Sequence, residues 1–365
     1  MSRALAAADG VSEILVHTGQ HFDPGMSEIF FEELGLAAPH VNLGIHGGGH
    51  GEMTGRMLTA LERVIIEERP DLVLVPGDTT STLAGALAAA KLHVPVAHLE
   101  AGLRSYNRRM PEEINRVLTD HISALLLCPT ATAVANLRHE GVVRGVHDIG
   151  DVMYDATLFA AAAARRSPVL DRLGIAPHSY AVATVHRAES TEDADTLGEI
   201  LAFLRERARD CTVVLPIHPR TRKQIEACKL DLAGITTCDP VGYLDMQRLL
   251  QSAVAVFTDS GGLQKEAYFH RVPCVTLRSE TEWVETVEAG WNRLWKGPDY
   301  APRNEIDAYG DGRAAAKAVA LIINHLRGCP SPSRCAGPSP SRCAGPSLSP
   351  QAGRGRGEGA LPATP

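Results

Sequence analysis

The stretch DLVLVPGDTTSTLAGALAAAKLHVPVAHLEA, residues 71–101, decides the fold of this chain. The apolar runs at 71–78 and 94–101 predict two strands, and the segment 79–92 between them predicts a helix with Thr79 or Thr80 as its N-cap. Both runs are rich in Val, Leu and Ala without regular polar alternation, which is typical of parallel strands buried on both faces. Residues 71–101 therefore predict a strand–helix–strand unit of an α/β fold.

The same alternation of short apolar runs and amphipathic segments extends through most of the chain. In the first half it predicts a strand at 13–19, a helix at 57–69, a helix at 111–123, and strands at 124–130 and 147–152. It then restarts, and the strands expected in the second half lie at 179–186, 212–218, 235–240, 253–260 and 273–277. Two successive units of this kind predict two doubly wound, Rossmann-like domains, residues 1–155 and 156–328. A ligand is expected in the cleft between them, beyond the carboxyl ends of the strands.

The composition argues against several classes of protein. The 365 residues carry a formal net charge of −7, which argues against a dedicated nucleic-acid binder because such proteins present a basic surface. No apolar run reaches the roughly 18–20 residues of a membrane span, the first ten residues lack the apolar core of a signal peptide, and the eight cysteines are scattered. We therefore expect a cytoplasmic protein with no membrane span, no nucleic-acid partner and no structural zinc.

The segment from residue 329 onward differs from the rest of the chain. It repeats PSPSRCAG at 330–337 and 338–345 and continues as a sequence rich in Pro, Ser, Gly and Arg. Such a composition offers too little apolar surface to offset the conformational entropy lost on folding. Residues 329–365 are therefore expected to form a disordered, low-complexity tail.

A candidate phosphate site follows the predicted strand 253–260. It reads Asp259-Ser260-Gly261-Gly262, where paired glycines allow close approach of the backbone and the N–H groups that begin the next helix attract an anion. A tight turn without a ligand is the alternative. Glu266, less than two helical turns further on, can reach the ribose of a nucleotide or can be a solvated helix residue. Neither GxGxxG nor GxxxxGK[ST] occurs here, so the signatures of NAD-binding proteins and P-loop hydrolases are lacking.

Basic residues follow the ends of other predicted strands in the second half. Arg187 comes after the strand 179–186, and His218, Arg220 and Arg222 come after the strand at 212–218. Each of them alone is more typical of an ordinary surface charge than of a ligand contact. Together they favour a polyanionic ligand such as a diphosphate.

Acidic residues mark the corresponding positions in the first half. Asp78 and Glu100 end the two strands of the stretch 71–101, and Glu112 begins the next helix. Ends of neighbouring parallel strands converge, and a carboxylate close to others has a raised pKa that suits general acid–base chemistry. The alternatives are an N-cap role for Asp78 and compensation of the helix dipole for Glu112. His186, at the end of the strand 179–186, is a candidate for proton transfer or phosphate contact, or is a hydrogen-bonded core histidine.

Several longer runs resemble one enzyme family in sequence and in order. They are GDTTSTLAGALAAAKLHVPVAHLEAGLRS, MPEEINRVLTDHIS, TVHRAE, PIHPRTRK, TDSGGLQKEA and TEWVETVEAGWN, within a likeness from about residue 17 to residue 327. They resemble the non-hydrolysing UDP-N-acetylglucosamine 2-epimerases. The resemblance implies a GT-B fold, a UDP-sugar substrate and a homodimer. It also implies a reaction in which a carboxylate removes the C2 proton while UDP leaves C1, with no nicotinamide, metal or other cofactor.

The resemblance also assigns roles to residues, motif by motif. It implies catalytic roles for Asp78, Glu100, Glu112 and His186. The predicted substrate-binding residues are Arg116, Arg187, His218, Ser260, Gly261, Gly262 and Glu266, of which Ser260, Gly261 and Glu266 match positions for the diphosphate and the ribose. Which carboxylate is the base and which the acid stays open.

Three features differ from the family pattern. The family begins with a strand and a GTRPE-like loop, whereas residues 1–10 resemble the end of the following helix, so the first strand and its Arg are expected to be missing from this sequence. The segment GGGHGEMT at 47–54 lacks the Arg-Gln pair of members that their own substrate activates. Ser190 stands where the family usually has Asn.

The substrate and the exact activity leave alternatives. UDP-N-acetylglucosamine, interconverted with its manno epimer for surface polysaccharide synthesis, is the first expectation. The variants LRSYNRRMPEEINR and IGDVMYDA resemble a subgroup that includes epimerases of UDP-2,3-diacetamido-2,3-dideoxyglucuronate. A GT-B glycosyltransferase and an inactive nucleotide-sugar-binding protein are hypotheses of other classes. A requirement for an acceptor separates the glycosyltransferase from an epimerase.

Overall fold

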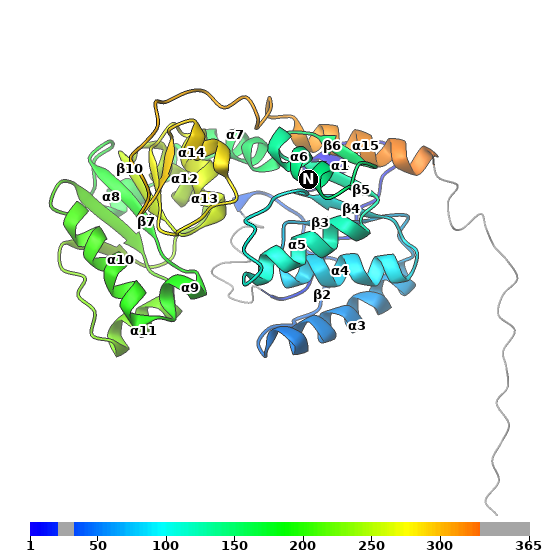
Figure 1. Cartoon of the computed structure of the whole chain (residues 1–365), viewed down its shortest axis with the longest axis horizontal. Coiled ribbons are helices and arrows are strands. Elements are labelled where there is room, and N and C mark those ends of the chain that lie inside the picture. The colour runs from blue at the N-terminus through cyan, green and yellow to red at the C-terminus, as the bar shows by residue number, and fades with distance from the viewer. Residues whose placement is uncertain (21–32, 329–365) are drawn as a thin grey trace, which may run out of the picture. The chain divides into compact units, whose positions relative to one another are not determined.

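The computed structural model (Figure 1) describes residues 1–20 and 33–328, so the predicted tail 329–365 lies outside the described residues. Its first large sheet has four parallel strands in the order of the sequence: β3 (Val73–Pro76), β4 (Val96–Leu99), β5 (Leu125–Cys128) and β6 (Val146–Asp148). The helices of this part are α1 (Ser2–Ala6), α3 (His50–Glu68), α4 (Thr80–Lys91), α5 (Pro111–Ile122) and α6 (Ala131–His139). The strand–helix–strand unit predicted at 71–101 is confirmed as β3, α4 and β4.

The predicted strand at 13–19 is shorter in the structure and belongs to a separate small sheet. Only β1 (Val16–His17) forms, and it pairs in parallel with β2 (Val41–Asn42) as a separate two-stranded sheet. On either side of these two residues, the carbonyl oxygens of Leu15 and Thr18 accept backbone hydrogen bonds from His40 and Ile45 without extending the strand. The prediction of one longer strand was therefore wrong in its length.

The second large sheet contains six parallel strands. They are β7 (Tyr180–Thr184), β8 (Thr212–Pro216), β9 (Ile235–Cys238), β10 (Ala255–Thr258), β11 (Cys274–Thr276) and β12 (Asn292–Leu294), in the order β12-β11-β10-β7-β8-β9. The chain thus builds outward from β7 on one side and then from β10 on the other. Ligands of such sheets bind where the strand order reverses, which here is between β7 and β10.

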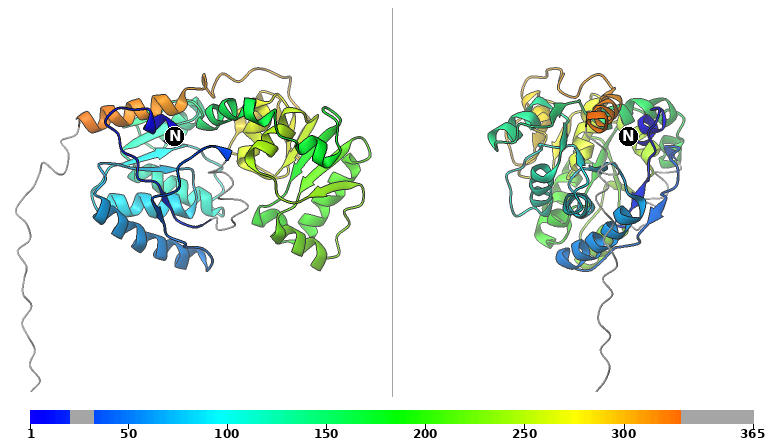
Figure 2. Two further views of the ribbon diagram at one scale, coloured as in Figure 1. Left: turned by 180° about the vertical axis from the view of Figure 1, so that it is seen from behind. Right: turned by 90° about the vertical axis from the view of Figure 1, so that its right-hand side faces the viewer.

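Helices cover both faces of this second sheet (Figure 2). The helices of this part are α7 (Val152–Ala164), α8 (Val169–Leu173), α9 (Ala188–Thr191), α10 (Ala194–Arg207), α11 (Pro219–Ala227), α12 (Tyr243–Gln251), α13 (Gly261–Phe269) and α14 (Val284–Glu288). Of these, α10 and α11 pack in the buried cluster on one face, and α8, α12 and α13 pack in the cluster on the other. Alternate residues of β7 explain the two layers. Ala181 and Ala183 belong to the core that contains Leu197 of α10, whereas Tyr180 and Val182 belong to the core that contains Leu249 of α12. Because both faces are buried, β7 reads as an uninterrupted apolar run.

The last helix, α15 (Ala314–Gly328), packs against the first large sheet although it follows the second in sequence. Ala318 and Ile322 share a buried cluster with Leu99 of β4 and Leu127 of β5. The α/β fold with two parallel sheets agrees with the sequence analysis, and the domain boundary near residue 155 stays a prediction. Within the described part of the chain, no helix is both long and apolar enough to cross a membrane.

Candidate active site

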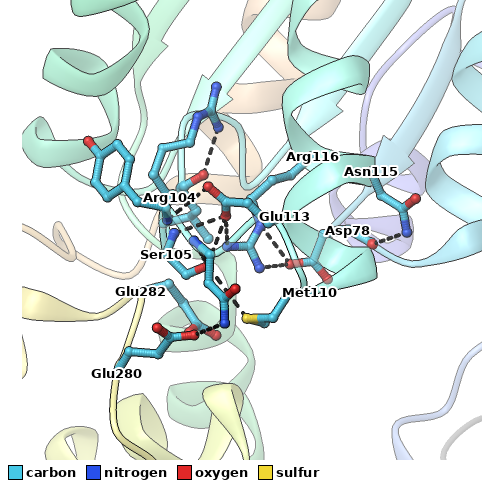
Figure 3. Close-up of polar contacts among 12 residues, drawn as sticks. Asp78, Arg104, Ser105, Met110, Glu113, Asn115, Arg116, Glu280 and Glu282 are labelled. Atoms are coloured by element: carbon cyan, nitrogen blue, oxygen red, sulfur yellow. Dashed lines mark hydrogen bonds and ion pairs between the residues drawn. The ribbon is translucent and has the colours of Figure 1, made fainter.

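Asp78 lies in the turn between β3 and α4, and its carboxylate is not used as a helix cap. Thr79 is the N-cap of α4, because its Oγ1 accepts a hydrogen bond from the N–H of Thr82. The carboxylate of Asp78 instead accepts two hydrogen bonds from Arg116 of α5, from Nε at 3.1 Å and from Nη2 at 2.5 Å (Figure 3). Thr79 was one of the two caps that the sequence predicted, and the N-cap alternative for Asp78 is wrong.

The protonation of Asp78 is set by opposing influences. Burial raises the pKa of Asp78 above its usual range, the neighbouring carboxylates Glu282 and Glu112 act in the same direction, and the Arg116 guanidinium opposes them. Its side chain keeps 29% of its surface exposed, so a ligand can reach it. A carboxyl with a raised pKa and an accessible oxygen suits general acid–base chemistry.

The two glutamates at the start of α5 have different surroundings. Glu113 is buried and accepts hydrogen bonds from the N–H groups of Ser105 and Tyr106, each 2.9 Å long, and from Nη1 of Arg116 at 2.9 Å (Figure 3). Within the described part of the chain, no hydrogen bond or ion pair engages the half-buried Glu112 carboxylate. Glu113 therefore orients Arg116, whereas Glu112 keeps its carboxylate available. The i, i+3 spacing of Glu113 and Arg116 was the signal that sequence analysis overlooked.

Glu100 lies in the turn after β4 and faces the turn that carries Asp78. Its backbone φ is 67°, a left-handed conformation that costs a non-glycine residue about 1–3 kcal/mol. Its Oε2 is 3.6 Å from the position that a Cβ on Gly77 would occupy. Its Oε1 accepts a hydrogen bond of 3.1 Å from Nζ of Lys265, which belongs to α13. Burial raises the pKa of Glu100, and Lys265 limits that rise.

A buried polar network lies behind the turns that follow β3 and β4. His98 Nε2 is 2.7 Å from the carbonyl oxygen of Gly77, and His98 Nδ1 is 2.6 Å from Oδ1 of Asp120. The other carboxylate oxygen of Asp120 accepts hydrogen bonds from the N–H of Gly102 at 3.1 Å and from Nη1 of Arg104 at 2.7 Å. Both ring nitrogens of His98 thus lie within hydrogen-bond distance of an oxygen atom. The network therefore holds Gly77, which precedes Asp78, and Gly102, which lies in the turn after Glu100.

In the second sheet, His186 and Asp259 follow the neighbouring strands β7 and β10. Nδ1 of His186 is 3.2 Å from Oδ1 of the fully buried Asp259, whose Oδ2 accepts the N–H groups of His186 and Arg187 at 2.9 Å each. Burial alone would raise the pKa of Asp259, but these contacts lower it. The His186 side chain is 49% exposed. It is therefore not a core histidine, and the alternative of a buried histidine is wrong.

The first residues of α13 have little space around them. Ser260 caps the helix by accepting the N–H of Leu263 at 3.5 Å. A Cβ on Gly261 would lie 2.5 Å from Oε1 of Glu282, and one on Gly262 would lie 3.1 Å from Cε of Met153, so a larger residue here would have to displace these side chains. The backbone N–H groups at the N-terminus of a helix can receive an anion.

Arginines surround Glu282 beside this helix start. Arg278 Nη1 is 3.1 Å from Oε2 of Glu282, and Arg187 Nη2 is 3.9 Å from its Oε1. Burial works in the opposite direction, yet Arg278, Arg116 and Arg187 together lower the pKa of Glu282. The positive charge collected here is suitable for a diphosphate. Arg278 and Glu282 were missed as individual site residues, although the run RSETEWVE follows a predicted strand end.

The other predicted binding residues have varied surroundings. Glu266 is only 6% exposed and accepts a hydrogen bond from Nε2 of Gln247 at 2.8 Å, so its solvated alternative is wrong. Burial raises the pKa of Glu266 to about 7. His218 is half-buried after β8, whereas Arg222 pairs with the exposed Asp239. The Arg220 side chain lies outside what the structure describes.

Residues of both halves of the chain meet at this site. Besides the Lys265–Glu100 pair, Asn107 Nδ2 donates to Oε1 of Glu280 at 2.7 Å (Figure 3). In the described residues, no three His, Cys, Asp or Glu side chains are grouped as a metal site. The structure therefore brings together carboxylates that can exchange protons, arginines, and a helix N-terminus for an anion.

Comparison with known proteins gives a consistent result. The family model for UDP-N-acetylglucosamine 2-epimerase matches residues 3–323. The UDP-2,3-diacetamido-2,3-dideoxy-D-glucuronate 2-epimerase of Pseudomonas aeruginosa is 55% identical over 80% of this chain and 83% of its own length. A UDP-N-acetylglucosamine 2-epimerase homolog of Methanococcus maripaludis is 47% identical over 86% of this chain and 92% of its own. The crystal structure of Methanocaldococcus jannaschii UDP-GlcNAc 2-epimerase with UDP-GlcNAc and UDP is 40% identical, with a TM-score of 0.82 over 88% of this chain and 94% of that one.

Proposed function

The chain belongs to the UDP-N-acetylglucosamine 2-epimerase family, and on that premise we propose that it interconverts UDP-N-acetylglucosamine and UDP-N-acetylmannosamine. It is accordingly an isomerase that acts on a UDP-sugar, and its two parallel sheets are those of the GT-B fold. The single observation that carries the proposal is the pairing of Asp78 and Glu100 at one edge of the first sheet. Both are carboxyl groups with raised pKa values on adjacent strand-end turns.

The proposed chemistry needs one proton acceptor and one proton donor at C2 of the sugar. One carboxylate removes the C2 proton, the electron pair of the C–H bond forms a C1–C2 double bond, and the C1–O bond breaks with release of UDP. A carboxyl group then protonates C2 from the opposite face, and UDP adds back at C1. The candidates are Asp78, Glu100 and Glu112, and the assignment of base and acid among them stays a prediction.

The departing UDP carries negative charge that the second sheet can stabilise. The N–H groups of Gly261 and Gly262 begin α13, and Arg187 and Arg278 lie beside them around Glu282. Donors already in place where charge develops lower the barrier without reorganising at that moment. We assign the diphosphate to this helix start, the ribose to Glu266, and a supporting role to Arg116, which contacts Asp78.

A second candidate substrate is favoured by one observation. The Pseudomonas aeruginosa relative, at 55% identity, acts by its name on UDP-2,3-diacetamido-2,3-dideoxy-D-glucuronate. That sugar differs at C3 and C6 but undergoes the same inversion at C2, so the same carboxylates and helix start would serve it.

The experiment is an incubation with each UDP-sugar, without any acceptor, followed by proton NMR in deuterated water. Epimerisation by proton exchange places deuterium at C2 of both epimers. Retention of the original hydrogen, or turnover that depends on an added acceptor, would contradict the proposal. The ratio of kcat/KM for the two sugars identifies the preferred substrate.

Three broader expectations rest on family likeness and stay predictions: a homodimer, a cytoplasmic location, and a role in surface polysaccharide synthesis. For the homodimer, α5 offers an exposed apolar face made of Ile114, Leu118 and Ile122 at helical spacing. Light scattering of the wild type and of Leu118→Lys tests it, since a dimer that uses this face dissociates in the variant.

A further inference from the structure

Lys265 is the most deeply buried cation near the candidate active site. Its side chain has no exposed surface, and its Nζ lies 2.5 Å from Oδ2 of Asp151 and 3.1 Å from Oε1 of Glu100. The same Nζ is 3.7 Å from the centre of the Trp283 ring. A buried ammonium is costly unless it is paired, so the two carboxylates and the ring face account for its presence.

The partners of Lys265 come from separate parts of the chain. Glu100 follows β4, whereas Asp151 follows β6 and caps α7 by accepting the N–H of Met153 at 2.7 Å. Lys265 itself stands one helical turn after Gly261 on α13, directly before Glu266. One helix thus carries the proposed diphosphate and ribose contacts and also touches a proposed proton-exchanging carboxylate.

We propose that Lys265 is a positioning residue that orients Glu100 and supplies the positive charge beside its carboxyl group, and that it ties Glu100 to the helix that binds the leaving group. The inference rests on the proposed function and deepens it, because it names what sets the protonation of one reacting carboxylate. Lys265 acts through Glu100 and needs no contact with the substrate.

The charges around Glu100 determine the direction in which its pKa moves when one of them is removed. Lys265 from α13 favours the ionised form, whereas Asp151 and Asp78 favour the neutral form, and burial raises the pKa of Glu100. Removing the lysine charge must therefore raise the pKa of Glu100 further. Removing the Asp151 charge must lower it. A contact that only supports the fold would not move a titration in opposite directions.

The test uses three variants of the full chain and the pH profile of kcat. In Lys265→Met, which keeps the apolar stem, we expect one limb of the profile to move to higher pH by about one unit or more, with about a tenfold change in kcat on that limb. In Asp151→Ser, which keeps a capping oxygen for α7, the same limb moves to lower pH. Lys265→Arg keeps the charge and leaves the limb near its wild-type position.

A matched control is Lys296→Met, because Lys296 pairs with Glu199 on the exposed surface and takes no part in the contacts of Glu100. It leaves both limbs in place. The inference is overturned if neither limb moves in Lys265→Met, or if Lys265→Met and Asp151→Ser move it in the same direction.

A second measurement works without turnover. The side-chain carboxyl of Glu100, labelled with carbon-13 and assigned by the loss of its signal in Glu100→Gln, reports its titration directly. A higher midpoint in Lys265→Met than in the wild type supports the inference, and an unchanged midpoint overturns it. If the wild type epimerises neither sugar, the proposed function fails, whereas this titration still decides whether Lys265 controls Glu100.

Discussion

Replacing Asp120 by Asn tests whether the buried network behind the active-site turns holds them in place. Asp120 has no exposed side-chain surface and accepts hydrogen bonds from His98, Arg104 and the N–H of Gly102. All three partners donate, so the amide N–H₂ of asparagine must face one of them, and the buried carboxylate charge beside Arg104 is lost. Breaking a buried ion pair in this way costs about 3–5 kcal/mol.

That loss is a large part of the 5–15 kcal/mol or so that stabilises an ordinary domain. The matched control is Glu140→Gln, because Glu140 binds the same Arg104 at 2.7 Å but keeps 28% of its side chain exposed. Water replaces part of its contact, so the control should lose about 1 kcal/mol or less. Urea titrations at pH 7.5 measure both free energies of unfolding, and kcat should fall in Asp120→Asn because both carboxylate turns shift.

The pH dependence follows from the partners of Asp120. Burial alone would raise its pKa, but His98 and Arg104 lower it, so the stabilising contribution is present above the unfolded value of about 3.9 and is lost as the pH falls through the folded pKa. The difference between wild type and Asp120→Asn is therefore complete at pH 7 and shrinks only in strong acid. Equal losses in the two variants, or a loss below about 1 kcal/mol in Asp120→Asn, would refute the reasoning.

Further predictions concern the reaction, the titration of a binding residue and one glycine. Asp78→Asn and Glu112→Gln should each lower kcat by about a hundredfold or more, and near-normal rates in both would remove them from the proton transfer. Glu266→Gln should gain stability relative to the wild type as the pH rises toward 7, because burial raises the pKa of Glu266 to about 7 and its ionisation costs stability over that range; melting temperatures at pH 5 and pH 8 measure this. Gly102→Ala should melt at a clearly lower temperature, since φ is +81° and the new Cβ would lie 2.3 Å from the carbonyl oxygen of Ala133.

Local sequence was sufficient to predict most of the elements that form the two large sheets. Apolar runs mark most strands from β3 to β11, and Thr79 marks the start of α4. The strand predicted at 147–152 overlaps β6 only at residues 147–148, because α7 already begins at Val152. β12 was missed because Asn292-Arg293-Leu294 has no strand pattern of its own and is extended by pairing with β11. The two-residue β2 was likewise missed, whereas its partner β1 lies within the predicted run 13–19.

Some residues of the candidate site can likewise be predicted from local sequence, and others depend on tertiary packing. Residues directly after strand ends, such as Asp78 and Glu100, can be found from sequence because topology places strand ends at one edge of the sheet. Lys265 and Asp151 cannot, because their pairing joins positions 114 residues apart and depends on how two helices pack. Asp259 was visible in the phosphate motif, but its contact with His186 depends on β7 and β10 being neighbours.

The packing of α15 against the first sheet has a consequence for synthesis of the chain. Domains generally fold in order as they leave the ribosome. Here Leu99 and Leu127 of the first sheet share their buried cluster with Ala314, Ala318 and Ile322, which are translated after every strand of the second sheet. Until then these leucines lack part of their cover. The nascent first half therefore exposes apolar surface until α15 is made, and chaperones bind such surface. A chain released before residue 314 cannot complete this buried cluster.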